Sequence, residues 1–575
     1  MGSDPENSEL GPGAGAGSRV RPQTMRTTTA AGLFLALTLL LTWPVPLHPA
    51  SAAMPMGPDG DLFAWTLAWN AHALLARPLA LFDANIYHPL RHTLAFSENL
   101  IGSALLGAPI IWATGNPVLA LNVVALLSVM LCGLGAFVLA RRLGLGPAAA
   151  VVAGVIFAFS PPRFFRTSQL HLGVVQWMPF ALASLHAYLD TGRRGDLRLA
   201  AALFTLQALS SGHGAVFLAI AMGGLLAWSF AAGTPVAPLR RARDLGVVGA
   251  LLMVPSMLVY LPYRAVQQEM GLRRTLENWA VTPESFIAAP THVQAALLSL
   301  LPGPRVLDTA SAFLFPGVLP LLLALAALGV VVSRRPPGAF RPRSIAFYGA
   351  LCVLGIWLSI GPPLGLWPLV YWLPGMSFIR VPSRFTILAM LGLAIVAAAG
   401  FEWLAARAAP ARRRAFAAMV TLLLVAEFAA MPLAVEPFRI DPPLADRWLA
   451  GRPGPFAVAE VPLPDPRHPG AFERRQTLYM LHATAHWQKT VHGYSGIRAP
   501  LHDRLYALLR TFPDEASLDE LDRLGVRYVV VHTELYPPGE WEQVAARIDE
   551  SGRRLQLEHV AGPGRVYSLH RPTPQ

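Results

Sequence analysis

Long apolar segments, separated by short clusters of arginine, dominate residues 27–435 of the chain. Several apolar segments, such as 28–46 and 117–140, are about 19 to 24 residues long, enough for a helix to cross a hydrocarbon core of roughly 30 Å. Arginine clusters between such segments are typical of cytoplasmic loops. The pattern predicts an all-α polytopic membrane domain with about eleven transmembrane helices. The arginine clusters lie at 141–142, 193–194, 240–243, 334–343 and 407–414.

The arginine clusters also predict a topology. If every cluster is cytoplasmic, the spans between clusters must come in pairs, and the sequence offers such pairs. The first span leads outward and the last leaves the C-terminus outside. This parity requires that 99–114 does not cross, so we expect a re-entrant or surface-lying helix there. The expected spans are 28–46, 117–140, 147–160, 173–189, 197–210, 213–232, 245–262, 313–332, 344–360, 384–406 and 415–433.

The N-terminal region predicts a cytoplasmic tail followed by a large outer loop. Residues 1–26 begin with a Gly-, Pro- and Ser-rich stretch and are expected to be disordered. The segment from Met25 resembles a secretory signal, but we expect it to remain as the first span. The membrane domain, 27–435, then contains the first outer loop, 47–116. In this loop, DLFAWTLAWNAHALLAR (61–77) predicts a helix lying in the membrane interface; an ordinary packed loop helix is the alternative.

The composition changes at residue 436, and 436–575 predicts a separately folded extracytoplasmic α/β domain. FAVAEVPL (456–463) and VRYVVVHT (526–533) are typical of strands, and SLDELDRLG (517–525) of a helix ended by glycine. LQLEHVAGPGRVYSLHR (555–571) predicts two strands joined by a turn. The alternation of helix and strand permits a parallel strand pair.

Composition and charge support a membrane protein and exclude several other classes. The 575-residue chain is 54% hydrophobic and 14% charged, with mean hydropathy +0.45 and a net charge of +12. Almost all of its basic residues are arginines. Arginines confined between apolar segments argue against nucleic-acid binding. Cys132 and Cys352 lie in apolar spans and offer neither a disulfide framework nor a metal site. No Walker A, GxSxG or dinucleotide fingerprint is present. We therefore expect a multi-pass protein of the bacterial inner membrane, with a cytoplasmic N-terminus and an outer C-terminal domain.

Charged residues near membrane depth are candidate site residues because they are costly to place there. Asp59 and Asp61, in GPDGDLFAW, could bind a divalent cation, supply a general base, or cap the following helix. Asp61 is placed to act as the cap, which leaves Asp59 as the sharper candidate base. An acid beside arginines is what transfer of a sugar from a lipid phosphate requires. The candidate binding residues on the same face are His88, Glu98, Arg163, His171, Arg380 and Arg384, with Arg166 and His213 nearby.

His482 and His486 are four residues apart in YMLHATAHWQKTVHGYSG, with His492 close behind. On a helix, the first two would share one face and could bind zinc. A surface or substrate-facing segment of aromatic residues and histidines is the alternative, and we predict no resident metal or cofactor.

Several motifs together resemble a known enzyme group. They are DGD at the start of the first outer loop, N-x-Y-H-P at 85–89, ARRLG at 140–144, FAFSPP at 157–162, QLHLG at 169–173, FIRVPSRF at 378–385 and LGVRYVVVH at 524–532.

In this order the motifs resemble bacterial membrane glycosyltransferases of the GT-C superfamily, related to the dolichyl-phosphate-mannose mannosyltransferases. The resemblance implies inverting transfer from a polyprenyl-phosphate sugar to an extracytoplasmic lipid, glycan or protein, with a first-loop acid as base. That acid is Asp59 or Asp61 here. A non-catalytic transporter or flippase of lipids or lipid-linked glycans is the alternative. It is disfavoured because we see no internal repeat and few ionisable residues within the spans.

Overall fold

The computed structural model describes residues 25–55, 57–232, 236–271, 281, 283–301, 313–332, 342–361, 364–373, 376 and 379–571. The disordered tail expected at 1–26 therefore lies outside the described residues, apart from its last two positions. Most of the arginine cluster expected at 334–343 also lies outside them.

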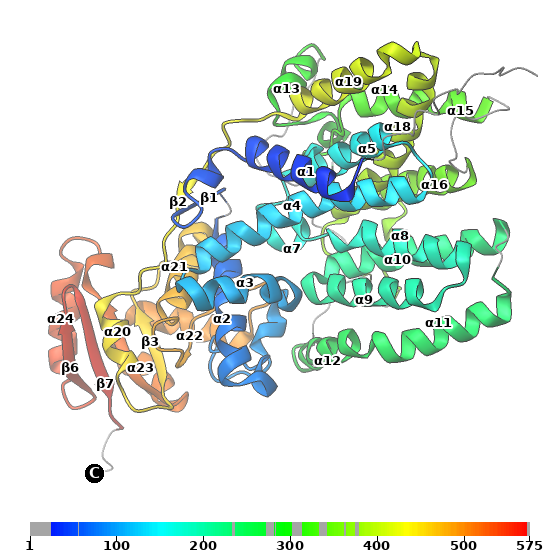
Figure 1. Ribbon diagram of the computed structural model, residues 1–575. Coiled ribbons are helices and arrows are strands. Elements are labelled where there is room, and N and C mark those ends of the chain that lie inside the picture. Colours follow the sequence, from blue (N-terminus) through cyan, green and yellow to red (C-terminus); the bar gives the residue numbers. More distant parts are fainter. Residues whose placement is uncertain are drawn as a thin grey trace, which may run out of the picture.

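A bundle of apolar helices forms the larger part of the molecule, and a small sheet domain lies beside it (Figure 1). Five helical segments of the described chain are long and apolar enough to cross a membrane, or six if the bent pair α11–α12 counts as one span. The mostly helical fold is confirmed, whereas the number of about eleven spans stays a prediction. The principal helices are α1 (Thr27–Leu41), α3 (Ile101–Thr114), α4 (Pro117–Arg142), α5 (Pro147–Phe159), α8 (Trp177–Thr191), α9 (Arg194–Ser210), α10 (Gly212–Ala232), α11 (Pro238–Leu252), α12 (Val254–Glu269), α14 (Val318–Ala326), α16 (Pro342–Ser359), α18 (Thr386–Arg407) and α19 (Arg413–Phe428).

Glycines allow the first helix to pack closely against the bundle. The ring of Phe34 on α1 is fully buried against α4 and α5. A Cβ atom at Gly133 or Gly154 would overlap this ring, so the helices can approach here only because both positions lack a side chain. The first apolar segment is thus part of the helical core.

The span expected at 245–262 is wrong as a single helix. The chain forms two helices there, α11 and α12, whose axes differ by 59°. Pro255 lies in the first turn of α12, where it has no N–H to continue the hydrogen bonding of α11 and its ring would clash with a helical carbonyl. A proline-induced break therefore divides the apolar segment.

The helix expected in the membrane interface is instead packed inside the protein. It forms α2 (Pro58–Ala76), which contacts α3, α4 and α21 of the C-terminal domain. Phe63, Trp65 and Trp69 are each no more than 2% exposed, so neither tryptophan can reach lipid headgroups. The interfacial placement is wrong, because the C-terminal domain and two neighbouring helices cover the aromatic residues.

The C-terminal domain has the α/β character predicted for it. Its five-stranded sheet has the order β4-β3-β5-β7-β6, with β3 parallel to both β4 and β5 and antiparallel pairing of β5 with β7 and of β7 with β6. The predicted strands and hairpin are confirmed, and the parallel pairing that the sequence permitted is present. The predicted helix ends before Gly525, whose φ of +74° is one that glycine adopts without strain. The elements are α20 (Leu444–Ala450), β3 (Ala457–Val461), α21 (Pro469–His482), β4 (Lys489–Thr490), α22 (Pro500–Leu508), α23 (Glu515–Arg523), β5 (Val526–His532), α24 (Glu540–Glu550), β6 (Leu555–Ala561) and β7 (Gly564–Leu569).

Backbone hydrogen bonds join the first outer loop to this domain. β1 (Ala52–Ala53) pairs antiparallel with β2 (Glu436–Pro437). Residues 85–88 run beside 489–492, where the N–H of Thr490 donates to the carbonyl of Asn85 at 2.7 Å and the N–H of Tyr87 donates to that of His492 at 3.0 Å. The first outer loop and the C-terminal domain therefore pack as neighbours, and α2 lies between the sheet domain and the helices (Figure 1).

We expect topology reporters to follow the arginine parity. A reporter fused at the C-terminus should report the outside, because the arginine clusters favour the cytoplasm and the last span leads outward. Alkaline phosphatase and green fluorescent protein fusions would measure this. A cytoplasmic C-terminus would contradict the parity and require α3 to be a true span. Fusions expected to report the cytoplasm follow Arg142, Arg194, Arg243, Arg413 and Arg335, the last outside the described residues.

Candidate active site

Asp59 lies in the first turn of α2, close to the C-terminal domain. Gly57, with a φ of 56°, precedes the helix, and Pro58 occupies its first position, where a missing N–H costs no helical hydrogen bond. A carboxylate so near the start of a helix is favoured by the helix dipole. The hydroxyl of Tyr494 donates a hydrogen bond of 3.1 Å to Asp59 Oδ1. Asp59 is therefore held in place from both the helix and the C-terminal domain.

The electrostatic surroundings of Asp59 combine partial burial with nearby positive charge. Burial raises the pKa of Asp59 above its ordinary value of 3.8. The hydrogen bond from Tyr494 and the charges of Arg384 and Arg380 oppose that shift. A carboxylate that binds a proton more readily than usual, with two guanidinium groups in its neighbourhood, is suited to act as a general base.

Asp61 has a different environment, and the capping role expected for it is wrong. The helix begins three residues earlier, at Pro58, because the Gly57-Pro58 pair already starts it. The side chain of Asp61 instead accepts a hydrogen bond of 2.6 Å from the hydroxyl of Thr477 on α21. Asp61 thus contributes a contact between α2 and the C-terminal domain.

The two acids do not converge on one point. Positions two residues apart on a helix are separated by about 200° around its axis. Consistent with this, Asp59 bonds Tyr494 whereas Asp61 bonds Thr477. The arrangement does not favour a divalent cation held between the two carboxylates.

Glu98, His213 and Arg384 form a hydrogen-bonded series. The Nδ1 of His213 lies 2.6 Å from Glu98 Oε1, and its Nε2 lies 2.6 Å from Arg384 Nη1. A guanidinium can only donate, so Nε2 accepts and Nδ1–H donates to the carboxylate. The N–H of Gly212, at the start of α10, donates to Glu98 Oε2 at 2.8 Å. Through the neutral imidazole, a buried carboxylate fixes the position of Arg384.

His171 connects this series to α2. It is 8% exposed and lies on the short helix α7 (Leu170–Gly173). Its ring centroid is 5.4 Å from that of His213 and 5.1 Å from that of Phe63 on α2. Three of the residues predicted from the sequence, Glu98, His171 and Arg384, are therefore brought together.

Arg163 and Arg166 are both completely buried but have different partners. Arg163, on α6 (Pro161–Phe164), donates to the carbonyls of Ala158 and Gly173 at 2.9 and 3.0 Å. These bonds hold together the ends of the break between α5 and α7. Arg166 donates to Ser383 Oγ at 3.1 Å, and its Nη1 has no hydrogen-bond partner in the protein.

Arg166 and Arg384 together form a region of concentrated positive charge. Burial and the charge of Arg384 lower the pKa of Arg166 to about 9. Arg384 belongs to η7 (Pro382–Phe385), the same turn that supplies Ser383. Two neighbouring guanidinium groups repel one another, and an anion between them would relieve that repulsion.

His88 and Arg380 occupy other places. His88 Nε2 lies 2.8 Å from the carbonyl of Leu524, so its side chain is part of the contact with the C-terminal domain. Arg380 is exposed, just before η7, and acts on Asp59 through its charge. The structure does not place His88 in hydrogen-bond contact with the other predicted residues.

A hollow of about 490 Å³ lies at the opposite end of α2 and is separate from these groups. His72, Trp112 and Trp487 contribute to its lining, and the rings of His72 and Trp487 stack at 4.4 Å. Along the helix, His72 is about 20 Å from Asp59. This hollow is therefore not part of the site around Asp59.

If Asp59 acts as a general base, the activity that depends on it should fall at low pH, with a midpoint above 3.8, the ordinary pKa of aspartate. The base acts only when deprotonated, and burial raises the pKa of Asp59, so activity is lost as the pH falls through that raised value. Rates measured from about pH 4 to 8 in detergent would show the acidic limb. Full activity at the acidic end would contradict the assignment, whereas Asp59→Glu should move the limb.

No protein-family model matches the sequence, and no curated protein sequence matches it. Among solved structures, the arabinofuranosyltransferase AftD from Mycobacteria is similar, with a TM-score of 0.59 and 17% identity. The similarity covers 96% of this chain, which spans only 40% of AftD.

Two further structures align with lower scores. For the oligosaccharyltransferase AglB from Archaeoglobus fulgidus the TM-score is 0.45 at 15% identity, over 88% of this chain and 69% of AglB. For ArnT from Cupriavidus metallidurans it is 0.41 at 15% identity, over 94% and 98%. The similarity to AftD shows that this chain shares a fold with that arabinofuranosyltransferase.

Proposed function

We propose that this protein is a membrane glycosyltransferase that transfers a sugar from a polyprenyl-phosphate donor to an extracytoplasmic acceptor. The observation that carries the proposal is the placement of Asp59, a partly buried carboxylate, within the electrostatic influence of Arg384 and Arg380. The fold shared with an arabinofuranosyltransferase supports the same reaction class.

In the proposed reaction, Asp59 takes the proton from an acceptor hydroxyl as its oxygen attacks the anomeric carbon of the donor sugar. The bond between that carbon and the phosphate oxygen breaks, and the sugar is transferred with inversion. The polyprenyl phosphate leaves with the electron pair, so the reaction needs no nucleotide. Asp59 contributes as general base and would be regenerated by losing its proton to water.

Arginines stabilise the phosphate in this proposal. A guanidinium stays charged and can bind phosphate through two parallel hydrogen bonds. Arg384 is held in place by His213 and Glu98, and the buried Arg166 lies near it with one unpartnered N–H group. Arg380 adds charge from the exposed side. Negative charge developing on the leaving phosphate would therefore be met by groups already in position.

The C-terminal domain is proposed to help recognise the acceptor. Tyr494 and Thr477 bring it into contact with both acids of α2. An acceptor that reaches Asp59 would consequently approach beside this domain. In this proposal, the surface of the C-terminal domain beside Asp59 would determine whether the acceptor is a lipid, a glycan or a protein.

A transfer assay tests the proposal against the transporter alternative. Purified protein in detergent would receive a radiolabelled polyprenyl-phosphate sugar and a cell-envelope extract as acceptor source, with the corresponding nucleotide sugar as comparison. We expect label to enter the acceptor fraction from the lipid donor alone. Movement of the lipid-linked sugar across proteoliposomes without any transfer would support the flippase instead.

A further inference from the structure

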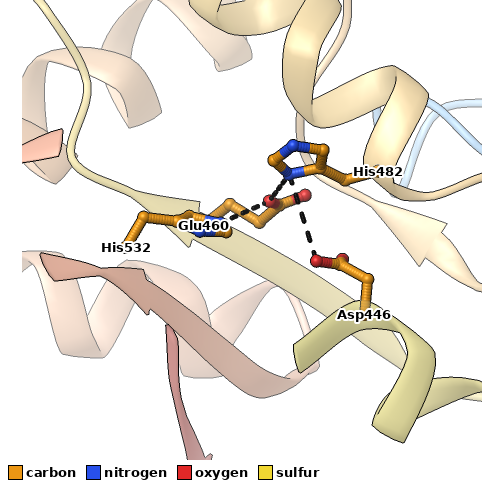
Figure 2. Close-up of side chains that lie close together, drawn as sticks. All are labelled: Asp446, Glu460, His482 and His532. Carbon is orange, nitrogen blue, oxygen red and sulfur yellow. Dashed lines mark hydrogen bonds and ion pairs between the residues drawn. The ribbon is translucent and has the colours of Figure 1, made fainter. Parts of the chain in front are cut away.

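A buried cluster of two carboxylates and two imidazoles lies within the C-terminal domain (Figure 2). Asp446 comes from α20, Glu460 from β3, His482 from the end of α21 and His532 from the end of β5. None of the four is more than 6% exposed. Four elements distant in sequence thus place ionisable groups at one point of the domain interior.

The ligand-type atoms of these side chains all lie within 4.8 Å of one another. His482 Nδ1 and His532 Nε2 each lie 2.8 Å from the same oxygen, Oε2 of Glu460. Asp446 Oδ2 lies 4.0 Å from His482 Nδ1, which is beyond hydrogen-bond distance. The four side chains therefore bring their ligand-type atoms together in one small region, with Glu460 Oε2 in contact with both imidazoles.

Several atoms of the cluster lack a partner in the protein. Neither carboxylate oxygen of Asp446 accepts a hydrogen bond, although this residue is 0% exposed, and Glu460 Oε1 also has none. A buried carboxylate that accepts no hydrogen bond is costly, since it has lost its hydration and Asp446 gains in return only imidazoles at 3.7 and 4.0 Å. Such groups persist where a ligand supplies the missing interaction.

We propose that Asp446, Glu460, His482 and His532 bind a zinc ion. With neutral imidazoles the two carboxylates carry a charge of −2, which one divalent cation would neutralise. Imidazole nitrogen and carboxylate oxygen are ligands that zinc accepts in a tetrahedral site. From the sequence alone we predict no resident metal. The sequence could not identify this site because Asp446 and Glu460 do not form a known metal-binding motif with the histidines.

The distances fit a small contraction around one ion. Zinc bonds of about 2.1 Å imply ligand atoms about 3.4 Å apart in a tetrahedron. The two 2.8 Å contacts to Glu460 would lengthen, and the 4.0 Å gap between Asp446 and His482 would shorten, by about equal amounts. The widest separation in the cluster, up to 4.8 Å, would shorten by up to about 1.4 Å, which side-chain rotamer changes of the kind common on binding can supply.

The pair predicted from the sequence, His482 and His486, does not share a helix face, because α21 ends at His482. His486 Nε2 instead lies 3.7 Å from Asp446 Oδ1. From there it can orient the Asp446 carboxylate, as groups behind metal ligands commonly do. His492 Nε2 accepts a hydrogen bond from the N–H of Glu460, its Nδ1–H donates to Gln476 Oε1, and the residue lies outside the four-residue cluster.

The proposed ion would have a structural role. All four positions around it are protein ligands, which leaves no open site for a substrate. It would connect α20, β3 and β5 to α21, the helix whose Thr477 bonds Asp61 on α2. The zinc would therefore fix the part of the C-terminal domain that supports the acid-bearing helix, and this inference does not depend on the proposed glycosyl transfer.

Metal analysis of the full-length protein tests the proposal. The protein, purified in detergent with an affinity tag that contains no histidine, is expected to hold about one zinc per chain. Asp446→Asn and Glu460→Gln should lose most of it, whereas His468→Asn, at an exposed histidine of the same domain, should keep it. A chelating phenanthroline isomer should lower the Tm and added zinc restore it; the non-chelating isomer should have no effect.

Asp446→Asn also separates zinc binding from a metal-free network by the sign of its effect on stability. If the cluster holds zinc, the variant should melt at a lower temperature than the parent protein. If it holds none, removing a buried charge that accepts no hydrogen bond should raise the Tm. Two results together would overturn the proposal. The parent protein would contain no more zinc than the Glu460→Gln variant, and Asp446→Asn would have a higher Tm than the parent protein.

Discussion

Asp59→Asn is expected to lower the rate of glycosyl transfer roughly 100-fold or more. Asparagine keeps the size of the side chain and can still accept the hydrogen bond from Tyr494, but it cannot take a proton from the acceptor. Binding of the donor should stay near that of the parent protein, because other groups hold the phosphate. Transfer of radiolabelled sugar in membranes that carry each variant at equal protein level would measure the effect.

Asp61→Asn is the matched control on the same helix. Its amide oxygen can accept the hydrogen bond from Thr477 as the carboxylate does, so activity should change little. Full activity in Asp59→Asn with loss in Asp61→Asn would exchange the roles of the two residues. Full activity in both would remove these acids from the chemistry and favour the transporter.

Arg384→Ala is expected to raise the KM for the lipid-phosphate donor roughly 10- to 100-fold, the loss of about 1.5 to 3 kcal/mol of charge-assisted hydrogen bonding. Arg384→Lys should recover part of this, because lysine keeps the charge but cannot form two parallel bonds. Arg380→Ala should also weaken donor binding, through loss of charge near Asp59. Donor titrations at saturating acceptor would give the KM and kcat of each variant.

Arg91→Ala provides the control for this second series. Arg91 is an arginine of the first outer loop whose side chain is 78% exposed and paired with Asp83. An exposed pair of this kind contributes little to stability, and the donor KM should not change. An equal rise in KM for Arg91→Ala and Arg384→Ala would mean that general surface charge, and not the arginine near Asp59, attracts the donor.

Local sequence signals predicted several elements of the C-terminal domain because each strand and the stop of the helix are encoded over fewer than about ten residues. The strand at 526–532, the glycine that follows α23 and the hairpin at 555–569 are all of this kind. The prediction that Asp61 caps α2 is wrong, although the sequence signal for the helix start is also local. The Gly57-Pro58 pair starts the helix before Asp61.

Contacts between distant segments explain what the sequence could not predict. Trp65 and Trp69 have the composition of an interfacial helix, and only the folded chain shows that other elements cover them. The approach of Glu98 to Arg384 through His213 joins three separate outer segments. Tyr494, Asp446 and His532 carried no local signal, since each has chemical meaning only beside residues far away in the chain.

The bonds between α2 and the C-terminal domain set an order of events during synthesis. Asp59 and Tyr494 are 435 positions apart, and Asp61 and Thr477 are 416 apart. At roughly 5 to 20 residues per second, the first outer loop must wait about 20 to 90 s before its partners have been made.

Throughout that interval the aromatic residues of α2 have no C-terminal domain to cover them. The ribosome therefore finishes almost the whole membrane domain before either acid can be fixed in position. A nascent chain interrupted before residue 477 would display α2 with its apolar residues uncovered, which is the kind of surface that chaperones and proteases bind.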